Sequence, residues 1–300
     1  MRWIRVTIIC LVSWFVLCFP GIAGGAPISV QAGKLDDYGH LENDGPRCAS
    51  TATINSFQFL KNRYRINLVP GAGTDLESAR NALHDGWGDK QGPRDGVKGE
   101  CLQATFGKHR QTWWEAKGQW TEDFVPGQVV LEGMVFTKGL TEPDPKKWKF
   151  GDRLQQGAPT WDFLWRQISV GEDVEIAFTD EDVAKPTFDH AVTLVGLSFD
   201  DKNGNGEFDA GETQRITYLD PNDPTKLLTA SLTTSDVLFG GSLEFHYDSA
   251  NIDVGIYLAY SESPDRTLAV PEPTSFILVG FGAVFLLAYR WMPRRQTLRA

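Results

Sequence analysis

The sequence is poor in cysteine, and it contains no internal repeat or low-complexity segment. Only four cysteines occur among 300 residues, and Cys10 and Cys18 lie in the N-terminal segment. The other two, Cys48 and Cys101, can form one disulfide at most, or one of them can be a reactive thiol. With 41% hydrophobic residues the chain is globular rather than disordered.

Basic residues are also scarce. The chain has 29 lysines and arginines against 39 acidic residues, a formal net charge of −10. Six of the arginines lie in segments 1–25 and 269–300, so the body between them is more acidic still. An acidic surface repels phosphate backbones and anionic membrane surfaces, so we expect no nucleic-acid partner. The same charge suits calcium.

The N-terminal segment 1–25 combines a charged start, an apolar middle and a run of small residues. Arg2 and Arg5 precede an apolar run from Val6 to Phe19, which is followed by "GIAGGA". This order predicts a secretory signal peptide that is removed near Gly25 or Ala26. A retained membrane helix is the alternative, although the apolar run is short for a span.

The C-terminal segment 269–300 joins the triplet "PEP" at 271–273 to an apolar run and a basic tail. The apolar run extends from Phe276 to Tyr289, and "RWMPRRQ" follows it. Physical chemistry alone predicts a marginal membrane helix whose basic end remains in the cytoplasm.

This order of triplet, apolar helix and basic tail resembles the PEP-CTERM sorting signal of bacterial surface proteins. The resemblance implies export from a Gram-negative-type bacterium to the cell surface or extracellular matrix. It also implies an exosortase, a membrane transpeptidase, as the partner that acts on the tail, and contact with the membrane that is at least transient. A plain tail anchor is the alternative.

Within the body, 26–268, segments with helical spacing come first and segments with strand-like alternation come later. We expect helices at 48–64, from Thr74 onward, and at 161–168. We expect strands at 174–178, 190–199, 215–220, 242–247 and 254–260. Helices followed by consecutive strands predict an α+β domain, in which a helical subdomain packs on an antiparallel sheet.

The segment "DKNGNGEFDAGE", Asp201 to Glu212, has the spacing of a twelve-residue calcium-binding loop. Gly206 stands at the sharp turn, and Phe208 is the hydrophobic anchor. The expected ligands are the side chains of Asp201, Asn203, Asn205, Asp209 and Glu212 and the backbone carbonyl of Glu207. Calcium, which prefers six to eight oxygens, is therefore the predicted cofactor. A solvated acidic turn is the alternative.

Cys48 begins the 48–64 helix, His190 opens a strand, and Asp220 ends the next one. In type and chain order these three residues resemble the catalytic residues of papain-like cysteine peptidases. A helix N-terminus and a neighbouring imidazole both lower a thiol pKa, which activates the sulfur. His190 would then transfer the proton, and Asp220 would orient the ring. Asp189 and Asp223 are rival candidates for the orienting role.

The order Cys, His and Asp, with "HAV" opening the histidine strand and "LDP" ending the next, resembles papain-like cysteine peptidases, including bacteriocin-processing-type relatives. The resemblance implies a papain-like α+β fold over 26–268, with the cysteine helix packed on an antiparallel sheet. It also implies a peptide or amide substrate that forms a thioester at Cys48. That family usually has Gln six residues before the cysteine, where this chain has Glu42. We therefore predict Asn43 as the oxyanion donor, together with the Cys48 N–H.

The favoured function is thus an exported, surface-sorted cysteine peptidase or amidohydrolase stabilised by calcium. A non-catalytic surface or extracellular-matrix binding protein on the same fold remains open, as does a transglutaminase-like crosslinker. Cys48 could instead be a packed small residue or form a disulfide with Cys101. The tryptophans Trp113, Trp114 and Trp120 could be core residues or a platform that stacks on carbohydrate.

Overall fold

A computed structural model describes seven ranges of the chain: 26–44, 47–69, 75–86, 113–136, 150–180, 188–235 and 241–265. The predicted signal peptide, 1–25, and the predicted sorting segment, 269–300, lie outside these ranges, and so does Cys101. Within the described ranges, no helix has the length and apolar character needed to cross a bilayer.

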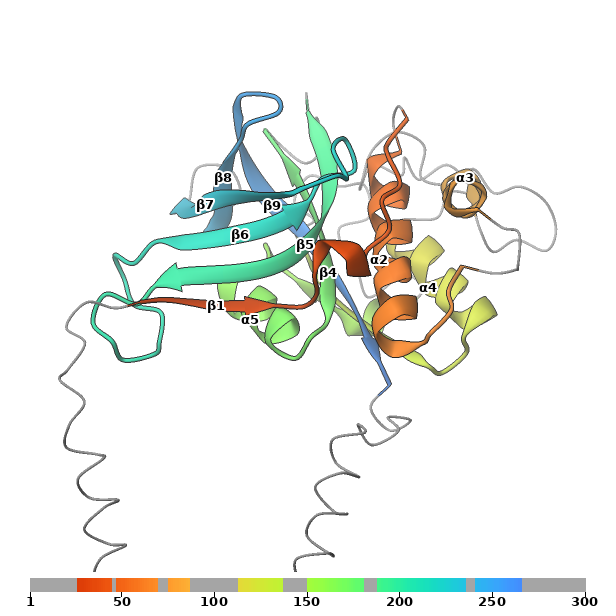
Figure 1. The fold of residues 1–300 in the computed structure, drawn as a ribbon, viewed down its shortest axis with the longest axis horizontal. Coiled ribbons are helices and arrows are strands. Elements are labelled where there is room, and N and C mark those ends of the chain that lie inside the picture. The colour runs from red at the N-terminus through yellow and green to blue at the C-terminus, as the bar shows by residue number, and fades with distance from the viewer. Residues whose placement is uncertain are drawn as a thin grey trace, which may run out of the picture.

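Six antiparallel strands close into a barrel (Figure 1). They are β4 (Asp173–Thr179), β5 (Asp189–Asp200), β6 (Gln214–Leu219), β7 (Leu227–Ser235), β8 (Ser242–Tyr247) and β9 (Ile252–Pro264). The strands β5 to β9 pair in chain order, each with its neighbour, and β4 closes the ring by pairing with both β5 and β9.

Three further strands extend this ring. They are β1 (Pro27–Gln31), β2 (Val129–Val135) and β3 (Leu154–Gln156). β1 pairs antiparallel with β5, β2 pairs antiparallel with β9, and β3 pairs parallel with β2. The strands β5 and β9 are twelve and thirteen residues long, so each can pair with three partners along its length.

Closure of the barrel is helped by two irregularities in strand pairing. The β5–β6 register shifts between Leu194 and Gly196, and the β4–β9 register shifts between Ala177 and Phe178. Such irregularities bend a strand and increase its twist. A strongly twisted sheet of six strands can then meet its own edge, which leaves fewer unpaired strand edges.

Helices α2 (Cys48–Tyr64), α3 (Leu76–Gly86) and α4 (Trp113–Phe124) lie together on one side of the barrel (Figure 1). The helix α2 packs on β4 and β5, where the hydroxyl of Thr193 donates to the Ala52 carbonyl at 3.2 Å. The helix α5 (Trp161–Ser169) packs against β1, β4 and β5. Two 3-10 helices, η1 (Leu35–Asp37) and η3 (Gly151–Arg153), complete the described elements.

The tryptophans of α4 belong to the core. Trp113, Trp114 and Trp120 are at most 1% exposed. The indole N–H of Trp113 donates to the Thr53 hydroxyl at 2.8 Å, and that of Trp120 donates to the Leu68 carbonyl at 2.6 Å. These three side chains therefore offer no exposed platform for a carbohydrate.

The predicted papain-like fold, with a helical subdomain packed on an antiparallel sheet, is wrong. The sheet of the described structure closes into an antiparallel barrel, and the helices lie beside it. Alternation along the sequence identified five of the six barrel strands, but it did not predict β7, and it carries no information on the β4–β9 pairing that closes the ring. Closure depends on strand length and bending, which local periodicity does not encode.

Candidate active site

The antiparallel order of the barrel brings the candidate catalytic residues to one end of it. The start of β5 lies beside the ends of β4 and β6, and the end of β8 lies at the same end of the ring. His190 stands near the start of β5, Asp220 directly follows β6, and Tyr247 ends β8. The fold therefore gathers side chains that are far apart in the sequence.

His190 and Asp220 form a buried pair. The Nε2 atom of His190 lies 2.9 Å from Oδ1 of Asp220, and their side chains are 5% and 0% exposed. The rival orienting residues have other partners. Asp189 accepts a hydrogen bond from the Tyr257 hydroxyl at 2.7 Å, and Asp223 pairs with Lys226.

Asp220 accepts two hydrogen bonds besides the one from His190. The N–H of Asn222 donates to Oδ1 at 2.8 Å, and the Tyr247 hydroxyl donates to Oδ2 at 2.5 Å. Burial by itself would raise the pKa of Asp220, but the hydrogen bonds from His190, Tyr247 and Asn222 hold that pKa below its usual range. The carboxylate is therefore ionised although it is buried.

Sequence reasoning missed Tyr247 and Asn222. The sequence does contain a signal for Asn222. An Asp side chain in a turn commonly accepts a hydrogen bond from the backbone N–H two residues later, and Asn222 stands two residues after Asp220. Tyr247 gave no comparable signal, since its place at the end of "SLEFHY" fits any buried strand residue.

The Cys48 thiol makes a hydrogen bond to the His190 ring. Because Nε2 of His190 faces Asp220, the ring nitrogen left for the sulfur is Nδ1. Burial would lower the pKa of His190, but the hydrogen bonds to Asp220 and Cys48 raise it to about 10. The imidazolium form is thus favoured at neutral pH, and a cation beside the sulfur favours the thiolate.

Cys48 is the first residue of α2, where backbone N–H groups lack partners inside the helix. The N-cap residue Arg47 makes no side-chain hydrogen bond that caps these groups. The positive end of the helix dipole therefore acts on the partly buried sulfur. The N–H of Cys48 is in a position typical of an oxyanion donor.

Asn43 lies beside the same end of the barrel. Its backbone N–H donates to the Pro221 carbonyl at 2.7 Å, and its Nδ2 donates to Oδ1 of Asn222 at 3.1 Å. Its own Oδ1 is buried without a hydrogen-bond partner among the described residues. Asn43 is thus close to the His190–Asp220 pair, but its amide is engaged by Asn222. The buried Arg80 side chain holds the preceding residue, because it donates to the Glu42 carbonyl at 3.0 Å.

The predicted calcium loop forms a compact turn between β5 and β6. The Asp201 carboxylate accepts from three backbone N–H groups of the turn at 2.7–3.1 Å. The side-chain amides of Asn203 and Asn205 both point at Asp209. Glu212 accepts from the Asp209 N–H at 2.9 Å, which ties the end of the loop to its middle. The carboxylate and amide oxygens of these side chains are ligands of the type that a hard cation such as calcium prefers.

The remaining predicted ligand, Glu207, and the predicted anchor, Phe208, follow each other in this loop. Glu207, whose carbonyl is the predicted backbone ligand, donates its N–H to Oδ1 of Asn205 at 2.8 Å. The Phe208 ring lies 5.9 Å from the ring centroids of both Trp161 in α5 and Phe199 in β5. The loop is therefore anchored on an aromatic cluster that also includes Trp165.

A second cluster of possible metal ligands is buried between the barrel and α4. Carboxylate oxygens of Asp173, Glu175 and Glu262 lie within 4.8 Å of one another, so the cluster could hold a metal ion. The Lys117 ammonium forms ion pairs with both Glu175 and Glu262. Burial raises the pKa of Asp173 and of Glu262 well above the usual range. Alternation in 174–178 revealed one buried face of β4, but not that helices cover the other.

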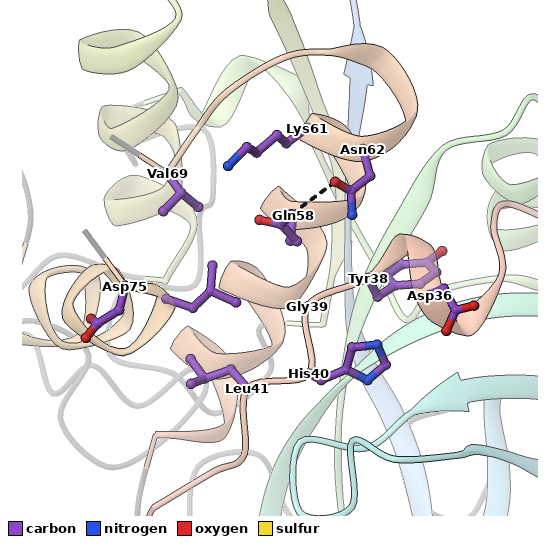
Figure 2. Close-up of a pocket in the computed structure, with 11 residues that line it drawn as sticks. Asp36, Tyr38, Gly39, His40, Leu41, Gln58, Lys61, Asn62, Val69 and Asp75 are labelled. Carbon is purple, nitrogen blue, oxygen red and sulfur yellow. Dashed lines mark hydrogen bonds between the residues drawn. The ribbon is translucent and has the colours of Figure 1, made fainter. Parts of the chain in front are cut away.

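A cavity of about 700 Å³ lies between η1, α2 and the start of α3 (Figure 2). Asp36, His40, Lys61 and Asp75 contribute charged or titratable groups to its lining. Its lining does not include Cys48 or His190, so this cavity is separate from the candidate catalytic residues. The mixed signs of its charges favour neither an anionic nor a cationic ligand.

No model of a known protein family matches the chain, and no curated protein sequence matches it either. A sulfur that contacts an imidazole, which in turn contacts a buried carboxylate, provides the groups required for nucleophilic acyl transfer.

Proposed function

We propose that the chain is an exported cysteine hydrolase, a peptidase or amidohydrolase, that acts by acyl transfer to Cys48. The observation that carries this proposal is the continuous contact from the Cys48 thiol to His190 and from His190 to the buried Asp220 carboxylate at 2.9 Å. A structural cysteine needs neither a charged imidazole nor an oriented ring. A nucleophile needs both.

In the first step the Cys48 thiolate attacks the carbonyl carbon of a peptide or amide, and a carbon–sulfur bond forms. The oxyanion that develops would accept a hydrogen bond from the Cys48 N–H at the start of α2. The His190 imidazolium then gives its proton to the departing nitrogen. The carbon–nitrogen bond breaks, the amine leaves, and a thioester remains on Cys48.

In the second step the neutral His190 ring takes a proton from water, and the resulting hydroxide attacks the thioester carbon. The carbon–sulfur bond breaks, the acid product leaves, and the thiolate–imidazolium pair is restored. Asp220 carries no proton in either step, because its role is to orient the ring and stabilise its charge. Asn43 would act as the second oxyanion donor through the other N–H of its Nδ2, since one N–H is donated to Asn222.

The test compares alkylation of Cys48 by iodoacetamide, and hydrolysis of a peptide library, in the wild type and three variants. Cys48→Ala and His190→Ala should abolish hydrolysis, and His190→Ala should slow alkylation at pH 6–7 because the imidazolium is lost. His246→Ala is the matched control, since His246 is also paired with an aspartate but is exposed. Hydrolysis that persists in Cys48→Ala contradicts the proposal. An inert Cys48 in the wild type favours a non-catalytic surface-binding protein.

We also propose that the chain is exported and sorted to the cell surface or extracellular matrix. The support is the order of charged, apolar and small residues in 1–25 and the triplet, apolar run and arginines in 269–300. An exosortase would act on the second segment. Mass spectrometry of both termini of the mature protein tests this, and a chain that keeps both segments intact contradicts it.

Calcium is the proposed structural ion of the loop Asp201 to Glu212. Residues Asp201, Asn203, Asn205, Asp209 and Glu212, with the Glu207 carbonyl, would hold it, and the bound ion would supply charge that ties the β5–β6 connection together. Addition of calcium after chelation should raise the melting temperature of the chain. Because Phe208 packs on Trp161, tryptophan emission should change in the same titration.

A further inference from the structure

We propose that Tyr247 is a positioning residue, which holds Asp220 so that this carboxylate can orient His190. The inference rests on the proposed hydrolase function. Tyr247 would act through Asp220 and not by contact with the substrate. Tyr247 ends β8, while Asp220 follows β6, so β7 separates their strands in the ring. The Tyr247 hydroxyl nevertheless reaches the Asp220 carboxylate.

The two oxygens of Asp220 have separate partners. Oδ1 faces Nε2 of His190 and the N–H of Asn222, whereas Oδ2 accepts from the Tyr247 hydroxyl at 2.5 Å. Asp220 is fully buried, and Tyr247 is 1% exposed, so water cannot easily replace a lost donor. Without the phenol, the carboxylate would keep a buried oxygen short of a donor and could rotate about its Cβ–Cγ bond. Rotation would misdirect Oδ1 and release the imidazole.

The surroundings of His190 explain why this single contact should matter. The charged or titratable groups that face the ring are Cys48 from α2, Asp220 after β6 and Tyr247 from β8. The uncharged neighbours are the Asn222 amide, whose Nδ2 lies 3.4 Å from Nε2 of His190, and two apolar rings. These rings are Phe178 in β4 and Phe188 before β5, at 5.6 and 6.1 Å between centroids. Asp220 is thus the counter-charge behind the imidazolium, and Tyr247 fixes that counter-charge.

The test measures the pKa of His190 by NMR of the isotope-labelled full chain, with the pH dependence of Cys48 alkylation as a second readout. Tyr247→Phe should lower the His190 pKa by about one unit and move the rise of Cys48 alkylation with pH to higher pH, because a less firmly held imidazolium favours the thiolate less. Tyr257→Phe is the matched control. Tyr257→Phe also removes a phenolic hydroxyl from a buried tyrosine. The partner of that hydroxyl is Asp189, which precedes His190 in sequence but does not orient the His190 ring.

A lowered His190 pKa in Tyr247→Phe alone supports the inference. An unchanged pKa in a folded Tyr247→Phe variant, or an equal change in both variants, overturns it. If the wild-type His190 titrates near pH 6.5 and Cys48 does not react with iodoacetamide, the hydrolase proposal itself fails. This outcome is seen in the wild type alone, so it is distinguishable from the results for the two tyrosine variants. Should Tyr247→Phe not fold, NMR of the Tyr247 ring carbon in the wild type decides. Its shift must follow the His190 titration, and a shift that stays constant overturns the inference.

Discussion

The barrel contains two His–Asp pairs of nearly identical separation and very different surroundings. The Nε2 atom of His190 lies 2.9 Å from Asp220, and the Nδ1 atom of His246 lies 2.9 Å from Asp253. The first pair has side chains that are 5% and 0% exposed, whereas the second pair is 48% and 83% exposed. Distance alone therefore does not distinguish a candidate catalytic pair from a surface contact.

What distinguishes the pairs is the set of further partners. Asp220 is held by Tyr247 and the Asn222 N–H, and His190 faces the Cys48 sulfur. Hydrogen bonds in a water-excluded site are stronger than those at the surface, where solvent and salt screen them. We expect the buried pair to respond strongly to substitution and the exposed pair hardly at all.

The largest expected difference between the pairs is in the free energy of unfolding when the aspartate of each pair is replaced by asparagine. Asp220→Asn should lower the free energy of unfolding by about 3 kcal/mol, because it removes the carboxylate that pairs with the buried imidazolium. Asp253→Asn should leave unfolding by urea unchanged within error, since its partner is in contact with solvent. Equal losses in the two variants would show that burial does not set the pairs apart.

The pH dependence of stability should also separate the pairs. Because the folded pKa of His190 is raised to about 10, its stabilising contribution is fully present below about pH 6.5 and is lost as pH rises toward 10. The pKa of Asp220 is lowered, so its contribution is present above about pH 3.9 and is lost as pH falls through the folded pKa.

Urea unfolding of the wild type and His190→Ala across pH 5–10 checks this dependence. The stability difference between the two proteins should be greatest near pH 5–6 and should shrink steadily toward pH 10. The difference between the wild type and His246→Ala should stay small at every pH. A His190→Ala difference that grows with pH has the wrong sign for this account.

The smallest expected effect is a change in melting temperature, and it concerns the segments that connect β5 to β6 and β8 to β9. The calcium loop joins β5 to β6, which carry His190 and lead to Asp220, whereas a short turn joins β8 to β9. Saturating calcium should raise the melting temperature by about 5 °C. Glu212→Gln, which removes a predicted bidentate ligand, should abolish the rise, and Glu207→Gln should retain it because only its carbonyl is a ligand. Loss of the rise in both variants points to surface charge rather than a site.

Sequence reasoning gave the local elements better than the architecture. The expected helix at 48–64 matches the bounds of α2, and the strand that His190 opens matches the core of β5. These succeeded because helical spacing and alternation are local signals. The barrel was missed because the β4–β9 pairing joins residues about 85 positions apart, and no local pattern records it.

The candidate site was predictable to a similar degree. The residue types and chain order led to Cys48, His190 and Asp220, which the fold places in contact, while their catalytic role stays a prediction. Tyr247 and the buried cluster of Lys117 with Glu175 could not be anticipated, since both depend on which faces of the strands are covered. Such contacts arise from tertiary packing rather than from spacing.

The central claim is that the Cys48 sulfur is ionised beside the His190 imidazolium at neutral pH. Thiolate absorbance near 240 nm, recorded at pH 6–7 in the wild type and in His190→Ala, tests it most directly. We predict an absorbance in the wild type that disappears on alkylation of Cys48 and is missing in His190→Ala at the same pH. A wild-type sulfur that ionises only above about pH 8.5, the ordinary value for a thiol, or that is joined to Cys101, would contradict the account.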